Sequence, residues 1–262
     1  MECPHSDMDY RALIIGMRST AGNMKAETVR VTIPEGYTVE QIIKLLAKNN
    51  VASEKDLVEA AKTANFNYSF IDNSSEELSR LEGYLFPDTY EFYKNSTPRE
   101  ALEKMLDNFN NRFTEEMRAQ LETLNANVTG GGYTVREITI IASLIEKESA
   151  APAESANIAG VIYNRLFNWD YPALLNIDAA IVYAQGGDAE SIDTNLDSPY
   201  NTYTNVGLTP GPIANPGLSS LQAALNPTSH NYYYYVLNPE SGMHTFATTQ
   251  EEHNANIAAF YN

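Results

Sequence analysis

The sequence contains a single cysteine, Cys3. One cysteine cannot form a disulfide within the chain or a metal site of several thiolates, so both are excluded. Long apolar runs are also absent, because the longest one near the N-terminus, ALIIGM, is too short to cross a bilayer. An apolar share of 43% and a charged share of 19% are nevertheless typical of a folded globular protein.

Basic residues are scarce, and the formal net charge is -17. The half from Leu144 to Asn262 has two basic residues, Lys147 and Arg165, against twelve acidic ones. Binding to nucleic acid requires clustered Lys and Arg that displace counterions, and an anionic membrane surface attracts the same residues. The charge therefore argues against both kinds of partner.

Charge of either sign is missing between Ser198 and Pro239, a segment rich in Tyr, Asn, Thr, Gly and Pro. Aromatic rings and neutral hydrogen-bonding groups suit a site for a neutral polar ligand such as a sugar. An ordinary loop-rich segment would have the same composition. Composition alone leaves both interpretations open.

Hydrophobic spacing predicts many helices and a few strands, which indicates the α+β class. Residues 29–33 alternate as a strand does, and helices are expected over residues 39–50 and 54–63. Further helices are expected over residues 8–17, 97–124, 135–148, 151–168, 178–187, 219–225 and 250–262, with a strand pair over 232–237 and 243–247. This order predicts a small N-terminal lobe followed by a larger, mostly helical lobe.

Capping pairs indicate where four of these helices begin. In such a pair, a Thr side chain accepts from the backbone three residues later, and a Glu or Gln there reaches back. The expected pairs are Thr38 with Gln41, Thr97 with Glu100, Thr134 with Glu137, and Thr248 with Glu251.

One helix turns from apolar residues to two carboxylates, Glu146 and Glu148, in the stretch IASLIEKESA at residues 141–150. At about 100° per residue, Glu146 continues the apolar stripe of this helix, whereas Glu148 lies about 200° away. A carboxyl partly buried by that stripe would hold its proton at neutral pH, as a general acid must. A solvated residue at a helix end fits the spacing as well.

Four other residues of this half are candidates for a site. Asp178 begins a helix, where it is either an ordinary N-cap or the partner carboxylate of a hydrolase. Arg165 is expected to pair with a carboxylate in or near a site, because cations are so few here. His244 and His253 are interpreted as hydrogen-bonding residues, since no third metal ligand has a suitable spacing. No metal site and no cofactor are expected.

Seven sequence segments, taken in order, indicate a protein family more specifically than the spacing of single residues does. They are VTIPEGYTVEQI, EGYLFPDTYEF, IASLIEKES, IAGVIYNRL, NIDAAIVYA, YNTYTNVGLTPGPIANPGLSSLQAALNP and HTFATTQEEHNANI. With these segments, residues 29–262 resemble the endolytic murein transglycosylases, also called the YceG-like family.

The resemblance implies a lytic transglycosylase that cleaves the bond between N-acetylmuramic acid and N-acetylglucosamine within peptidoglycan strands. It implies a LysM-like N-terminal region, residues 1–95, and a catalytic domain with a small β-sheet, residues 96–262. Residues 1–28 match poorly, so the LysM-like region is expected to be incomplete. Members act on the outer face of the bacterial cytoplasmic membrane, anchored by an N-terminal helix that this chain is expected to lack. Besides glycan strands, wall-synthesis enzymes are the partners that the resemblance implies.

Under the resemblance, Glu146 is the catalytic residue, as the first Glu of the EKE motif. It would protonate the glycosidic oxygen and then remove the proton of the C6 hydroxyl, which closes on C1 as a 1,6-anhydro end. No water attacks, so one carboxyl suffices. The candidates for the substrate-binding wall are Glu82, Asp88, Glu148, Asn164, Arg165, Asp178, Asn201, Tyr203, Asn215, His244 and Phe246.

Two alternatives stay open beside this function. The first is a hydrolytic muramidase in which Asp178 or Glu148 joins Glu146, and it would produce reducing ends. The second is a wall-binding protein without catalysis, in which Glu146 is structural.

Overall fold

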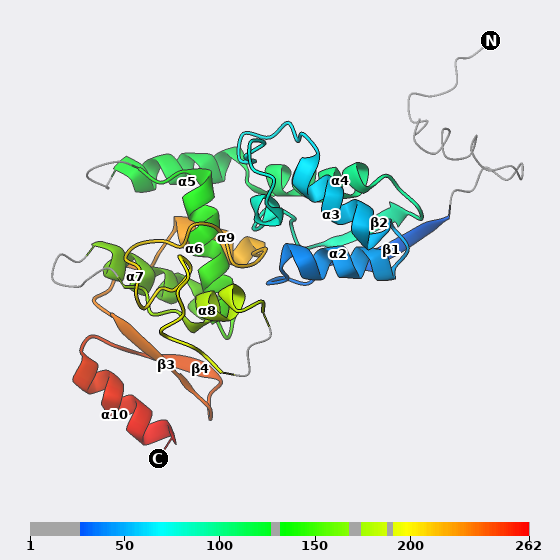
Figure 1. Ribbon diagram of the computed structural model, residues 1–262. Coiled ribbons are helices and arrows are strands. Elements are labelled where there is room, and N and C mark those ends of the chain that lie inside the picture. Colours follow the sequence, from blue (N-terminus) through cyan, green and yellow to red (C-terminus); the bar gives the residue numbers. More distant parts are fainter. Residues whose placement is uncertain (1–26, 127–131, 168–173, 188–190, 262) are drawn as a thin grey trace, which may run out of the picture.

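The computed structural model describes residues 27–126, 132–167, 174–187 and 191–261, which form two lobes joined side by side (Figure 1). The expected helix at residues 8–17 lies outside these ranges. The first lobe contains β1 (Thr28–Thr32), α2 (Val39–Lys48), α3 (Glu54–Thr63), η1 (Leu78–Leu81), β2 (Thr89–Tyr93) and α4 (Pro98–Arg112). The second contains α5 (Glu115–Ala126), α6 (Val135–Glu148), η2 (Pro152–Glu154), α7 (Ser155–Phe167), α8 (Asp178–Ala184), α9 (Leu218–Leu225), β3 (Tyr234–Asn238), β4 (Met243–Ala247) and α10 (Gln250–Tyr261).

The described part of the first lobe combines a two-stranded antiparallel sheet with three α-helices and one short 3-10 helix. Strand β1 pairs with β2, with Val31 opposite Tyr90, and α4 packs against α3 (Figure 1). Sequence spacing did not predict β2. Helix α4 lies with the first lobe, and the proposed domain division at residues 95 and 96 stays a prediction.

Aromatic rings fill the core of the first lobe. The ring of Phe109 lies 5.0 Å from Phe70, 5.1 Å from Tyr84 and 6.1 Å from Phe113, with edge-on or stacked geometry. Such pairs stabilise a core beyond the area that they bury. Phe109 thus connects α4 to the segments on both sides of it.

The second lobe is built around α6. Eight consecutive residues of this helix, from Ile138 to Ile145, are buried, and α9, α7 and α8 pack around it. The β3–β4 hairpin and α10 form an outer layer at the far end of this lobe (Figure 1). The coarse α+β class expected from the sequence is therefore confirmed.

The expected long helix over residues 97–124 is wrong, because the structure divides it into α4 and α5. Phe113 leaves helical geometry as its ring enters the core, and Thr114 Oγ1 then accepts from the N–H of Met117, which starts a new helix. The cap of α10 is also one residue later than expected, since the N–H of Glu252 donates to Thr249 Oγ1. Thr38 and Thr134 form the expected capping boxes.

Within the described ranges, no helix combines the length and the apolar character that a membrane span requires.

Asn215 joins the two lobes. Its side chain is fully buried, and Nδ2 donates to the carbonyl oxygen of Tyr37 at 2.9 Å and to Glu82 Oε1 at 3.0 Å. Its Oδ1 accepts from the N–H of Leu85 at 2.8 Å. Because one amide side chain satisfies three groups on two segments of the first lobe, its contacts fix the lobes relative to each other.

Glu82 is the carboxyl of this junction and is 3% exposed. The N–H of Val39, at the start of α2, donates to Oε1 at 3.1 Å, and the Tyr183 hydroxyl donates to Oε2 at 3.3 Å. Burial raises the pKa of Glu82 to about 8, although these hydrogen bonds oppose the shift. The carboxyl therefore holds a proton at neutral pH.

Replacement of Phe109 by Ala is expected to lower the free energy of unfolding by about 3–5 kcal/mol, because it leaves a cavity among three rings. Urea unfolding followed by circular dichroism measures the loss. Val206→Ala is the control: its side chain is 67% exposed, and a change within about 0.5 kcal/mol is expected. Similar losses in both variants would contradict the proposed core.

The stability of the protein is expected to fall as pH rises from about 4.5 to about 8. In this window the unfolded chain has released the Glu82 proton and the folded chain retains it, so each pH unit costs up to about 1.4 kcal/mol. Glu82→Gln removes this titration and should flatten the decline. Urea unfolding at several pH values compares it with the wild type and with Glu54→Gln, an exposed acid. Equal slopes in all three proteins would refute the assignment.

Candidate active site

Glu146 leaves the end of α6 on the side of α9. Its Oε2 accepts from the N–H of Gly217 at 3.0 Å and from Ser220 Oγ at 2.7 Å. These groups belong to the N-terminal end of α9, where free N–H groups and the helix dipole favour a carboxylate. Burial, and then the charge of Glu146, raise the pKa of Glu35 nearby. Glu146 thus meets the requirements of a residue that caps α9.

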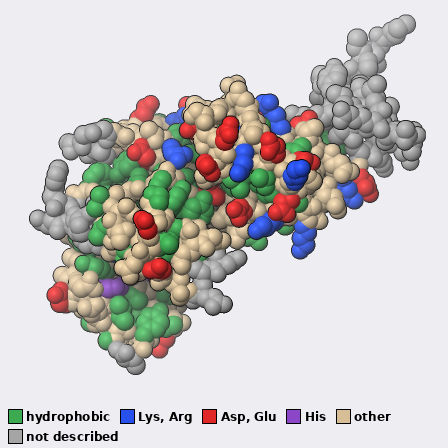
Figure 2. All heavy atoms as spheres, viewed as in Figure 1, with side chains coloured by type: hydrophobic (Ala, Val, Ile, Leu, Met, Phe, Trp, Pro, Cys, Tyr) green, Lys and Arg blue, Asp and Glu red, His purple; other side chains and the backbone are tan. Residues whose placement is uncertain are grey.

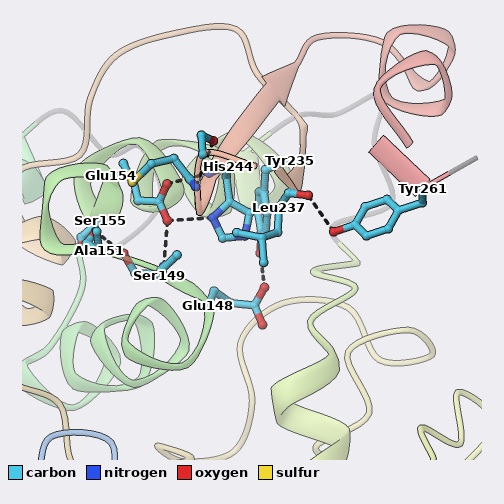
Figure 3. A network of polar contacts seen from close by, with 12 residues as sticks. Glu148, Ser149, Ala151, Glu154, Ser155, Tyr235, Leu237, His244 and Tyr261 are labelled. Atoms are coloured by element: carbon cyan, nitrogen blue, oxygen red, sulfur yellow. Dashed lines mark hydrogen bonds and ion pairs between the residues drawn. The ribbon is translucent and has the colours of Figure 1, made fainter. Parts of the chain in front are cut away.

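Glu148 leaves the same helix on the other side and is partly buried. Its Oε2 accepts from the hydroxyl of Tyr235 on β3 at 2.7 Å (Figure 3). Burial raises the pKa of Glu148, and the charge of Asp178 adds to the shift, while Tyr235, His244 and Arg165 oppose it. Among the described residues, Oε1 has no hydrogen-bond partner.

A cavity of ≈ 420 Å³ lies in front of Glu148. Its walls come from α6, α7, α8, β3 and α10, together with the segments before α8 and before α9. The lining residues are Glu148, Arg165, Asn176, Asp178, Tyr203, Tyr234, Tyr235, Val236, Gln250, His253 and Ile257. Aromatic rings and convergent polar groups in a cavity of this size are typical of a small-ligand or sugar-binding site.

Three of the predicted site residues meet Glu148 in this cavity. Asp178, the first residue of α8, accepts from the hydroxyl of Tyr203 at 2.6 Å. Arg165 on α7 donates to the carbonyl oxygens of Tyr233 and Leu175 and lies over the ring of Tyr235. The structure therefore brings together Glu148, Asp178, Arg165 and Tyr203.

Glu82 and Asn215 lie instead at the lobe junction. Glu82 borders a different cavity, of ≈ 500 Å³, between α2 and α8, and both of its oxygens accept hydrogen bonds from the protein. Asp88 lies in the first lobe, where it accepts from Asn108 and Arg112 of α4.

His244 binds Glu154 instead of lining the cavity. The 2%-exposed Glu154 lies 2.7 Å from His244 Nδ1 and accepts from the His244 N–H at 2.9 Å (Figure 3). Burial alone would raise the pKa of Glu154, but the hydrogen bonds from His244 and Ala150 bring it below its usual value. This contact fastens β4 to η2 behind Tyr235, whose ring meets His244 edge-on at 5.3 Å.

The remaining candidates organise loops. Asn164 donates to the carbonyl oxygens of His230 and Tyr232, and the buried Asn201 donates to those of Thr194 and Leu196. Phe246 belongs to an aromatic cluster with His230, Tyr232 and Tyr235. Their roles in substrate binding stay predictions.

Sequence reasoning missed Tyr235, Ser220 and Glu154. Tyr235 sits in a run of four tyrosines at residues 232–235, where alternation along a strand would have pointed every second ring to one side. Ser220 lies three residues after Gly217, the spacing of a helix start. Nothing in the sequence singles out Glu154 among the 34 acids.

The distribution of charged side chains on the surface agrees with the scarcity of basic residues in the second half of the sequence. On the face shown in Figure 2, Lys and Arg side chains gather over the first lobe, whereas the lower part of the second lobe carries acidic and apolar side chains. No three His, Cys, Asp or Glu side chains gather as a metal site in the described ranges.

Comparison with known proteins agrees with this architecture. The YceG-like family matches residues 5–259 of the chain. An endolytic murein transglycosylase of Streptococcus pneumoniae serotype 2 is 36% identical over 256 residues, which cover 88% of this chain and 44% of that protein. One from Bacillus subtilis is 33% identical over 260 residues, covering 94% of this chain and 68% of that protein.

A crystal structure of a yceG-like protein from Listeria monocytogenes shares the fold, with a TM-score of 0.74 and 31% identity. The match covers 87% of this chain and 75% of that one. The chain spans less than half the length of the S. pneumoniae relative. Because the family match extends over nearly the whole chain and the fold agrees, the chain belongs to the YceG-like family.

Proposed function

We propose that this protein is a peptidoglycan lytic transglycosylase, which cleaves between N-acetylmuramic acid and N-acetylglucosamine within glycan strands. The names of the relatives from S. pneumoniae and B. subtilis support the activity. The cavity in front of Glu148 supports the substrate class, because its tyrosines and amides suit a sugar.

The setting of Glu148 carries the mechanistic part of the proposal. A general acid needs a carboxyl that is protonated near neutral pH and faces the substrate. Burial raises the pKa of Glu148, and the residue lines the cavity. None of the described residues forms a hydrogen bond with its Oε1, which is therefore available to a ligand. Glu146, the acid predicted from the sequence, caps α9 through Oε2. The geometry therefore favours Glu148, and Glu146 stays the competing assignment.

The reaction then needs one carboxyl. Glu148 donates its proton to the glycosidic oxygen as the bond to C1 breaks, and the Tyr235 hydroxyl and the positive charge of Arg165 stabilise the carboxylate that forms. The Glu148 carboxylate then removes the proton of the C6 hydroxyl of the muramic acid whose C1 bond has broken. That oxygen bonds to C1, so the muramic acid ends as a 1,6-anhydro sugar and Glu148 is protonated again.

A hydrolytic muramidase is the second candidate, and the position of Asp178 favours it. Asp178 lines the same cavity and its charge acts on Glu148, so two carboxylates are available for an attack by water. The two reactions differ in their products, since hydrolysis leaves reducing ends.

We infer the wider setting from the family to which the chain belongs. We propose that the enzyme works outside the cytoplasmic membrane, tethered by an N-terminal anchor, and that wall-synthesis enzymes are partners. We also propose that residues 1–95 are a LysM-like region in incomplete form.

Glu148→Gln is expected to lower the cleavage rate of purified glycan strands by at least about 1,000-fold, because the amide cannot donate the proton. Mass spectrometry of the wild-type products should show ends that are lighter by one water than reducing muramic acid. Reducing ends would establish hydrolysis and direct the next variant to Asp178.

Glu146→Gln is the matched control, since its amide oxygen still accepts from Gly217 and Ser220. It should fold normally and retain most of the activity. Loss of cleavage in this variant, with activity retained in Glu148→Gln, would make Glu146 the acid. Full activity in both variants would refute a catalytic role for this helix end.

A further inference from the structure

His253 faces the cavity from α10, outside the buried core. The backbone N–H of His253 donates to the Thr249 carbonyl oxygen at 3.1 Å, in the first turn of the helix. Glu252 Oε2 accepts from the N–H groups of Thr248 and Thr249 at 2.8 and 3.3 Å. This cap fixes the first turn, and with it the place from which the imidazole reaches the cavity.

Stacking holds the imidazole in place. The ring of His253 lies 5.3 Å from that of Tyr234, at an angle of 24°. Its Nδ1 is buried and has no hydrogen-bond partner among the described residues, whereas Nε2 is not among the buried atoms. A proton on Nδ1 would be an N–H without an acceptor, which is costly. The favoured tautomer therefore carries its proton on Nε2.

The ring is neutral at neutral pH. Burial, and then the charge of Arg165, lower the pKa of His253. Packing alone does not explain why a histidine stands here, because α10 has no fully buried side chain. An apolar ring would also avoid the cost of burying Nδ1 without a hydrogen bond. What the imidazole adds to the cavity is one neutral N–H donor beside Glu148 and Asp178.

We propose that His253 is a substrate-binding residue, whose Nε2–H donates to a neutral oxygen of the bound saccharide, a hydroxyl or an acetamido carbonyl. The proposal rests on the proposed function, which supplies the ligand class. In this role the side chain holds the sugar against Glu148 and takes no part in proton transfer.

His253→Phe is the direct test, because it keeps the stacked ring and removes both nitrogens. We expect KM for glycan strands to rise about three- to tenfold, kcat to stay within about twofold, and the thermal midpoint to stay the same or rise. His253→Gln, which restores a donor, should recover part of the affinity. An unchanged KM in the Phe variant would overturn the proposal, and so would a lowered thermal midpoint in both variants.

Calorimetric titration of glycan strands into Glu148→Gln, with and without His253→Phe, separates binding from catalysis. Weaker binding in the double variant supports the proposal even if the wild type proves unable to cleave, which would refute the proposed function alone. Equal binding overturns the proposal. Strands with N-deacetylated glucosamine test one of these oxygens. If removal of that acetyl group abolishes the difference between the variants, the acceptor is the acetamido carbonyl of the glucosamine; otherwise it is a hydroxyl or the acetamido carbonyl of the muramic acid.

Discussion

The burial of the middle of α6, from Ile138 to Ile145, is the constraint on which the second lobe depends. With eight successive residues in the core, the helix has room for charge only where it ends. The helical period then sends Glu146 and Glu148 to opposite sides. Glu146 binds the start of α9, and Glu148 binds the β3–β4 hairpin. The end of α6 therefore both caps a neighbouring helix and places a carboxyl group in the cavity.

Several polar side chains that the sequence offers as site candidates also hold the fold together. The side chains of Asn215, Asn201 and Glu154 form hydrogen bonds with backbone groups of connecting segments. The described part of the chain has two small sheets and long connections, and its buried backbone groups need partners. The neutral polar composition of the second half therefore serves the fold as well as the cavity.

The sequence predicted the elements whose signals are local. Thr38 and Thr134 cap helices as their spacing required, and the expected strand pair forms, with β3 at Tyr234–Asn238 in place of 232–237. It failed where distant residues decide. Strand β2 exists because β1 lies beside it, and the break at Phe113 exists because that ring enters a core made by Phe109 and its neighbours. The choice between Glu146 and Glu148 depends on Ser220 and Tyr235, which lie more than 70 residues away along the chain.

Helix α10 contributes to the cavity without belonging to the core. It has no buried side chain, and its far end is fastened by the Tyr261 hydroxyl, which donates to the Leu237 carbonyl oxygen at 2.7 Å. Elements with so few buried contacts open locally at a much smaller free energy than the whole domain. Local unfolding would therefore open this wall of the cavity at a smaller free energy than the walls that α6 and α7 provide.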